Sequence, residues 1–200
     1  MDSAQEEHER RVGEQLMGWY NQWHGTSFRF DGRPDDAPDS YYSDGNVRLR
    51  VEVTSAFYDD GDDAKYEWLR QRGHPDAPDK WEGKDFEQYL VNDINLRIAA
   101  KCMNSYGPNC LLAVYVFPKL TFANEMETLI KSVSVPATHR FDGSYLCGEF
   151  PTPLDLYISR VLEDERPPPE RRVWQLYPPD EPPQNEQRNG VRGHDSRPWR

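Results

Sequence analysis

Asp39 and Glu52 are the residues of this sequence whose types and spacing best suit chemistry. They lie in two runs rich in aromatic and β-branched residues, and the Asp44-Gly45 pair between the runs is typical of a hairpin turn. Two carboxylates on one face of a hairpin can share a divalent cation that prefers oxygen ligands. The stretch 38–54 therefore predicts a carboxylate pair able to hold such a cation.

The hairpin register decides whether these two carboxylates can meet. If Asp44-Gly45 is a two-residue turn, Ser43 pairs with Asn46, and Asp39 lies opposite Arg50. Asp39 is then the diagonal neighbour of Glu52, at roughly 7–8 Å between α-carbons. The second run alternates: Leu49, Val51 and Val53 point to one face, and Arg50, Glu52 and Thr54 to the other. The alternative is an ordinary solvated face, since antiparallel hairpins often carry polar residues on one side.

A lysine in a predicted helix could join the two carboxylates. Residues 85–103 have helical periodicity, and at about 100° per residue Lys101 falls inside the stripe formed by Phe86, Leu90, Ile94 and Ile98. A lysine at that position either has a carboxylate partner or extends its ammonium to solvent from the helix end. A third interpretation is favourable interaction with the carbonyl end of the helix dipole.

The remaining elements suggest an α/β fold. A helix is expected over 3–23, a short strand over 28–30, the second hairpin strand as far as Tyr58, and a buried central strand over 110–117. Further on, the patterns suggest a helix over 124–133, an edge strand over 139–147, a helix over 154–162 and a strand over 172–177. Residues 59–63 suggest an acidic turn, and 64–84 an excursion that could cover the polar face of the hairpin. The proline-rich tail over 178–200 is expected to be disordered. This order favours a mixed sheet flanked by helices.

Composition limits the function classes. The net charge of −11 offers no general attraction to nucleic acid, so such binding would need a local basic patch or bridging metal ions. No apolar run is long enough for a transmembrane helix, and the N-terminus lacks the basic and apolar parts of a signal peptide. The three cysteines form no CxxC pair and are expected to be buried, reduced thiols. The sequence thus predicts a cytoplasmic protein that does not bind membranes.

Pro38-Asp39, followed by Glu52-Val53-Thr54 on the next strand, resembles the motif of the PD-(D/E)XK nuclease superfamily. The predicted α-β-β-β-α-β order is similar as well. The resemblance covers roughly residues 5–118 and implies a restriction-endonuclease-like core within a single domain, residues 1–177. Residues 119–177 would be a C-terminal elaboration of that core.

The resemblance also implies roles for individual residues. Asp39, Glu52 and the carbonyl of Val53 would bind Mg²⁺ or Mn²⁺, and Glu7 or Glu14 on the first helix would supply a further acid. Thr54 stands where the family normally has lysine, so Lys101 is the candidate catalytic lysine, with Lys84 as the second choice. Arg48, Arg50 and Thr54 are candidate substrate-binding residues.

The expected activity is metal-dependent hydrolysis of phosphodiester bonds, with DNA favoured over RNA as the substrate. Defence of a bacterial cell against foreign DNA is associated with such nucleases, and restriction-type members often form homodimers. The alternative is a non-catalytic module that keeps the fold and binds a partner protein, favoured by the acidic composition and by Thr54 in place of lysine. The tail from Pro178 is a candidate segment for a protein partner.

Overall fold

The chain alternates helices and strands around one sheet. The computed structural model describes residues 3–57, 86–116, 123–137, 139–150 and 170–177. In chain order the elements are α1 (Ser3–His24), β1 (Arg29–Gly32), β2 (Ser40–Ser43), β3 (Arg48–Ala56), α3 (Phe86–Cys102), β4 (Cys110–Val116), α4 (Ala123–Leu129), the short 3-10 helix η1 (Ile130–Ser132), β5 (Gly143–Phe150) and β6 (Glu170–Tyr177).

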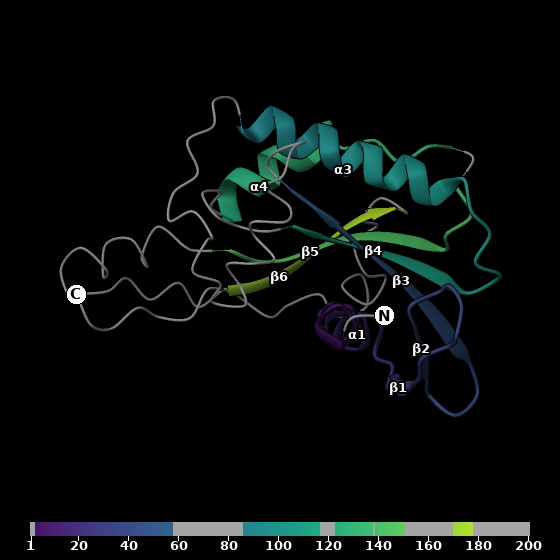
Figure 1. Cartoon of the computed structure of the whole chain (residues 1–200). Coiled ribbons are helices and arrows are strands. Elements are labelled where there is room, and N and C mark those ends of the chain that lie inside the picture. The colour runs from purple at the N-terminus through teal and green to yellow at the C-terminus, as the bar shows by residue number, and fades with distance from the viewer. Residues whose placement is uncertain (1–2, 58–85, 117–122, 138, 151–169, 178–200) are drawn as a thin grey trace, which may run out of the picture.

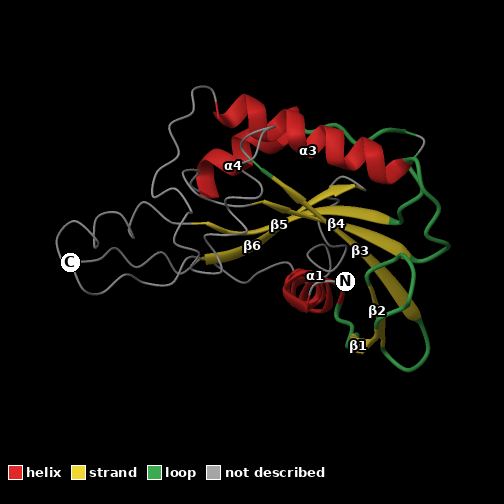
Figure 2. Ribbon diagram, viewed as in Figure 1, coloured by secondary structure: helices red, strands yellow, loops and turns green. Residues whose placement is uncertain are grey.

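The sheet is mixed and has six strands in the order β1-β2-β3-β4-β5-β6. β1, β2 and β3 are antiparallel neighbours, β4 is parallel to β3, β5 is parallel to β4, and β6 is antiparallel to β5. Helix α1 lies against one face of the sheet, while α3 and α4 lie against the other (Figures 1 and 2). The expectation of a mixed sheet flanked by helices in an α/β fold is confirmed.

The alternating side chains of β3 divide the apolar interior into two cores. Leu49, Val51 and Val53 pack beneath α1 with Val12 and Leu16. The residues between them face α3, whose apolar side chains form the second core with alternate residues of β4. Each β3 residue therefore belongs to one helix layer or the other, which follows from the two-residue period of a strand.

Helix α1 agrees closely with the predicted range 3–23. Val12 and Leu16 are fully buried, as their spacing of four predicts. Gly25 follows the helix with φ +64°, a left-handed conformation that glycine adopts without steric cost. Trp23 lies on the same helical stripe but is 43% exposed, and its ring stacks on that of Trp19.

The predicted two-residue hairpin turn is wrong. Ser43 pairs with Arg48, so the loop contains four residues, 44–47. The Asp44 carboxylate accepts hydrogen bonds from the backbone N–H groups of Asn46 at 2.9 Å and Val47 at 2.8 Å, which stabilises the longer loop. Tyr41, rather than Asp39, lies opposite Arg50. The register differs by two residues, so the side chains of the paired residues 40–43 and 48–51 keep their predicted faces.

The helix and strand that follow agree with their sequence patterns. In α3, Leu90, Ile94 and Ile98 are fully buried, as the predicted stripe requires. All seven residues of β4 are buried, which confirms the central strand expected near 110–117. The predicted helix 124–133 is shorter than expected, because α4 ends at Leu129 and continues as η1.

The predicted edge strand over 139–147 is wrong. β5 begins at Gly143 and lies between β4 and β6, and all of its residues except Glu149 are buried. The edge is formed by β6, which confirms the strand predicted over 172–177. Because β6 pairs with β5, β5 has no free hydrogen-bonding edge, contrary to the prediction from the sequence.

Several expectations lie outside the described residues. They are the acidic turn 59–63, the excursion 64–84 with Lys84, the helix 154–162 and the tail 178–200. Cys102, Cys110 and Cys147 are all free thiols; Cys110 and Cys147 are buried as expected, whereas Cys102 is only partly buried. Within the described part of the chain, no helix has the length and apolar character needed to span a bilayer.

Candidate functional site

Glu52 is an acidic residue enclosed between the sheet and α3. It lies at the middle of β3, pairs in the ladder with Leu112 of β4, and its side chain is only 4% exposed. Its neighbours Val51 and Val53 point to the α1 core, so the alternation of β3 directs Glu52 to the opposite face. Burial of a carboxylate is costly unless it has charged or hydrogen-bonding partners.

Lys101 provides one such partner from the last turn of α3. Its Nζ donates to Glu52 Oε1 at 2.5 Å, and its side chain is 28% exposed. Of the three interpretations of Lys101, the structure shows the carboxylate partner. Burial alone would lower the pKa of Lys101, but the hydrogen bond and the charge of Glu52 raise it, so the ammonium stays charged.

The second oxygen of Glu52, Oε2, is buried and accepts no hydrogen bond from the described residues, although the Tyr106 phenol lies near this carboxylate. Burial raises the pKa of Tyr106, and the charge of Glu52 adds to the rise, which places that phenol close to the carboxylate. A buried carboxylate oxygen with no donor is unusual, because buried polar atoms are nearly always paired. Oε2 is therefore available to a cation or a water.

Asp39 lies at the position where β2 separates from β3. It directly precedes the first residue of β2, and its Oδ2 accepts a hydrogen bond from the Val53 backbone N–H at 2.7 Å. The carboxylate thus occupies the place that a further β2 residue would take in the ladder. Within one strand residue the N–H and C=O point to the same side, so the Val53 carbonyl faces the Asp39 side of β3.

The charges of Asp39 and Glu52 act on each other. Burial and then the charge of Glu52 raise the pKa of Asp39 to about 7, well above the usual range for aspartate. The Val53 hydrogen bond and Lys101 oppose this rise without cancelling it. Two carboxylates that repel each other in a desolvated place bind a cation well, because the cation relieves the repulsion.

Among the acids of α1, Glu9 is the one paired with Arg33, the arginine that lies beside Asp39. Glu7 and Glu14 both form exposed ion pairs with Arg10. Glu9 is 7% exposed, and its two oxygens accept hydrogen bonds from Gln5 Nε2 at 2.8 Å and Arg33 Nη2 at 2.6 Å. Both Glu9 oxygens are therefore engaged by protein donors, and Glu9 orients Arg33.

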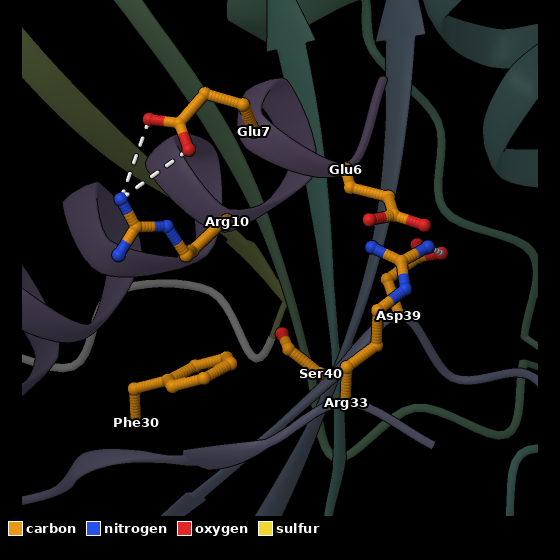
Figure 3. Close-up of a pocket in the computed structure, with 7 residues that line it drawn as sticks. All are labelled: Glu6, Glu7, Arg10, Phe30, Arg33, Asp39 and Ser40. Carbon is orange, nitrogen blue, oxygen red and sulfur yellow. Dashed lines mark hydrogen bonds and ion pairs between the residues drawn. The ribbon is translucent and has the colours of Figure 1, made fainter. Parts of the chain in front are cut away.

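Arg33 connects α1 to Asp39. Its Nη2 lies 3.9 Å from Asp39 Oδ1, and Figure 3 shows the guanidinium directed toward that carboxylate. Arg33 and Asp39 both line a shallow pocket of about 250 Å³ between α1 and the first strands. The pocket lining is completed by Glu6, Glu7, Arg10, Phe30 and Ser40. Asp39 is thus reached from the surface on the α1 side.

The donors present suit a cation bound by few protein ligands. Over the described ranges, no group of three or more histidine, cysteine, aspartate or glutamate side chains is arranged to hold a metal ion. Two carboxylates, Asp39 and Glu52, and the Val53 carbonyl remain as oxygen donors. Mg²⁺ is commonly held by one or two carboxylates together with waters, so this smaller set fits it.

The three predicted substrate-binding residues are placed differently from one another. Arg50 donates to the Pro108 carbonyl at 2.5 Å, and Arg48 forms an ion pair with Asp31 at 2.6 Å. Both guanidinium groups lie over the Tyr41 ring. Thr54 is half-buried on β3, one alternation beyond Glu52 on the same face. Arg48 and Arg50 are the members of this set that reach the surface near the site.

Glu9 and Arg33 are the site residues missing from the sequence-based prediction. Glu9 is three residues before Val12 and seven before Leu16, so helical periodicity places it on the buried face of α1. That signal was available in the sequence. Arg33 lies in a loop between β1 and β2, where no periodicity indicates direction.

No family model, curated protein or solved structure matches this chain.

Proposed function

We propose that this protein is a metal-dependent nuclease that hydrolyses phosphodiester bonds of DNA. The observation that carries the proposal is the convergence of Asp39, Glu52 and Lys101. Lys101 Nζ lies 2.5 Å from Glu52 Oε1, and the charge of Glu52 raises the pKa of Asp39. These groups come from the start of β2, from β3 and from the end of α3. Two carboxylates and a lysine ammonium in one largely buried cluster suit phosphoryl transfer chemistry.

The order of elements supports a PD-(D/E)XK type of site. The chain runs α1, β1, β2, β3, α3, β4, with Asp39 at the start of the second strand and Glu52 on the third. In this family type a lysine follows the glutamate by two residues, where this chain has Thr54. The Lys101 ammonium, which extends from the next helix to Glu52, supplies the missing charge.

Asp39, Glu52 and the Val53 carbonyl would hold the divalent cation. When bound, Mg²⁺ or Mn²⁺ would lower the pKa of a bound water and stabilise negative charge on the phosphate oxygens. Glu52 Oε2 accepts no hydrogen bond from the described residues, so it can bind a ligand while Oε1 keeps Lys101 in place. Lys101 then acts as a fixed cation that orients a water or neutralises a phosphate oxygen.

A non-catalytic protein-binding module is the second candidate, and one observation favours it. The Lys101–Glu52 ion pair already neutralises the more buried carboxylate, so the site is charge-balanced at that point without a metal ion. The net charge of −11 is also unfavourable for DNA. In this alternative the ion pair would only fasten α3 to the sheet.

Cleavage of supercoiled plasmid and single-stranded DNA by the wild-type protein distinguishes the two candidates. The nuclease proposal predicts nicking or degradation in Mg²⁺ or Mn²⁺ and none in EDTA. Absence of cleavage in both metals, together with no heat of Mn²⁺ binding by calorimetry, would contradict it and favour the binding module.

A further inference from the structure

The arm formed by β1, β2 and β3 has two faces of opposite character. Phe30, Tyr42 and Leu49 are paired across the three strands and face α1. The other face carries Arg29, Tyr41, Ser43, Arg48 and Arg50, which the same register places together, with Asp31 reaching Arg48. Directly opposite residues in antiparallel strands share a face, so these arginines form one surface. We call Arg29, Asp31, Tyr41, Arg48 and Arg50 the arginine face.

The tyrosine at the centre of the arginine face holds two guanidinium groups. Arg48 lies 5.2 Å and Arg50 6.0 Å from the Tyr41 ring centroid, within the range of cation–π attraction. Arg50 also donates to the Pro108 carbonyl, and Arg48 to Asp31. These contacts restrict two side chains that are otherwise mobile, so less conformational entropy is lost when they bind an anion.

The arginine face leads directly to Glu52. Arg48, Arg50 and Glu52 are alternate residues of β3 on one side of the strand, about 7 Å apart in succession. Lys101 meets Glu52 at the end of this row. A polyanionic strand lying along the row would therefore bring a phosphate to Lys101, whose side chain is 28% exposed beside the buried Glu52.

The opposite approach, from the α1 side, is acidic. The pocket that opens to Asp39 there is lined by Glu6 and Glu7 as well as Arg10 and Arg33, and both arginines are already paired with glutamates. A phosphate entering that pocket would meet Glu6, Glu7 and Asp39. The whole chain has a net charge of −11, but the arginine face, with three arginines and one aspartate, is locally positive.

We propose that the arginine face is the docking surface for the phosphodiester backbone of the nucleic acid substrate, which approaches the site along β3 and not through the α1 pocket. This inference rests on the proposed nuclease function, because it identifies how that substrate is bound. Asp31 acts against binding, since its carboxylate holds the Arg48 guanidinium that a phosphate would otherwise engage.

Fluorescence anisotropy with labelled single-stranded and duplex DNA in EDTA tests the inference without cleavage. Arg48→Gln and Arg50→Gln should each weaken binding severalfold for any sequence and lower the slope of log K against log salt by about 1. Asp31→Asn should strengthen binding severalfold by releasing Arg48. The matched controls on α1 are Arg10→Gln and Glu7→Gln, which change charge by the same amounts in an exposed ion pair and should leave binding unchanged.

Equal effects of the β-strand and α1 variants would show that only net charge matters and would overturn the docking surface. Absence of wild-type binding to either DNA at low salt would also overturn it, as would equal binding of a polyglutamate peptide. DNA binding that follows the predicted pattern in a protein that never cuts would leave the docking surface standing and refute the nuclease. Cleavage that is unchanged in Arg48→Gln and Arg50→Gln would support the nuclease and refute the docking surface.

Discussion

Lys101 and Glu52 are 49 residues apart in sequence, and their side chains meet at 2.5 Å beneath α3. This contact joins the last turn of α3 to the middle of β3, where a lone carboxylate would be strongly disfavoured. The other carboxylate oxygen of Glu52, Oε2, accepts no hydrogen bond from the described residues. The pair therefore fixes the helix and leaves an acceptor available in the same place.

Removal of the Lys101 charge should destabilise the fold. Lys101→Met would leave Glu52 buried without a counter-charge, and we expect a loss of about 3 kcal/mol in the free energy of unfolding by urea. The double variant Glu52→Gln/Lys101→Met should recover much of that loss, since no charge is then left unpaired. Lys131→Met, at an exposed lysine of η1, is the control. A Lys101→Met protein as stable as the control would contradict the ion pair.

Asp39 should make stability depend on pH in an unusual direction. Its pKa is about 7 in the folded protein and near 3.8 when unfolded, so the folded state binds the extra proton between these values. The protonated Asp39 thus contributes fully to stability below about pH 4. That contribution declines as the pH rises from about 4 and is lost once the pH has passed 7. At about 1.4 kcal/mol per pKa unit, the change is a few kcal/mol.

Urea unfolding of wild type and Asp39→Asn from pH 4 to 8 measures this dependence as a difference. Wild type should lose stability relative to Asp39→Asn as pH rises. If the difference in unfolding free energy stays constant with pH, burial and the charge of Glu52 do not raise the pKa of Asp39.

Glu9, and not Glu7, should be the important acid of α1. Glu9→Gln removes the charge that pairs with Arg33 at 2.6 Å, and we expect a loss of about 1–2 kcal/mol in unfolding free energy. Glu7→Gln changes an exposed residue and should lie within about 0.5 kcal/mol of wild type. Thermal unfolding of the two variants side by side would reverse this assignment if Glu7→Gln proved the more destabilised.

Two glycines of α1 should respond oppositely to alanine. A Cβ at Gly13 would lie 2.5 Å from the hydroxyl oxygen of the buried Tyr42, so Gly13→Ala should cost about 1–3 kcal/mol by overpacking, more than the helix propensity it gains. Gly18 has open space at that position, and Gly18→Ala should stabilise by up to about 1 kcal/mol. Denaturation midpoints that shift the same way in both would contradict the packing of α1 on β2.

The inward direction of Glu52 and Lys101 was predictable because both lie in strongly periodic elements. The two-residue alternation of β3 and the 100° period of α3 each assign a side chain to a face without knowledge of its partner. The buried position of Glu9 follows from the same helical period, with Val12 and Leu16 as markers.

The features that sequence patterns did not predict depend on side chains or on partners remote in the chain. The Asp44 carboxylate bonds to Asn46 and Val47 and lengthens the hairpin loop, which the Asp-Gly pair alone does not indicate. β5 is an interior strand because β6 pairs with its outer edge, and β6 begins only at Glu170, far along the chain from β5. Arg33 reaches Glu9 from a loop, where direction is set by tertiary contacts.

The most direct test of the catalytic site is the rate of DNA cleavage in Mn²⁺ by wild type, Glu52→Gln and Lys101→Ala. Glu87→Gln and Lys131→Ala change exposed residues of the same types and serve as controls. We predict that Glu52→Gln and Lys101→Ala each lower the rate by about 100-fold or more while remaining folded by circular dichroism, and that both controls cut like wild type. Cleavage that persists at the wild-type rate in Glu52→Gln would contradict the assignment of Asp39, Glu52 and Lys101 as a hydrolytic site.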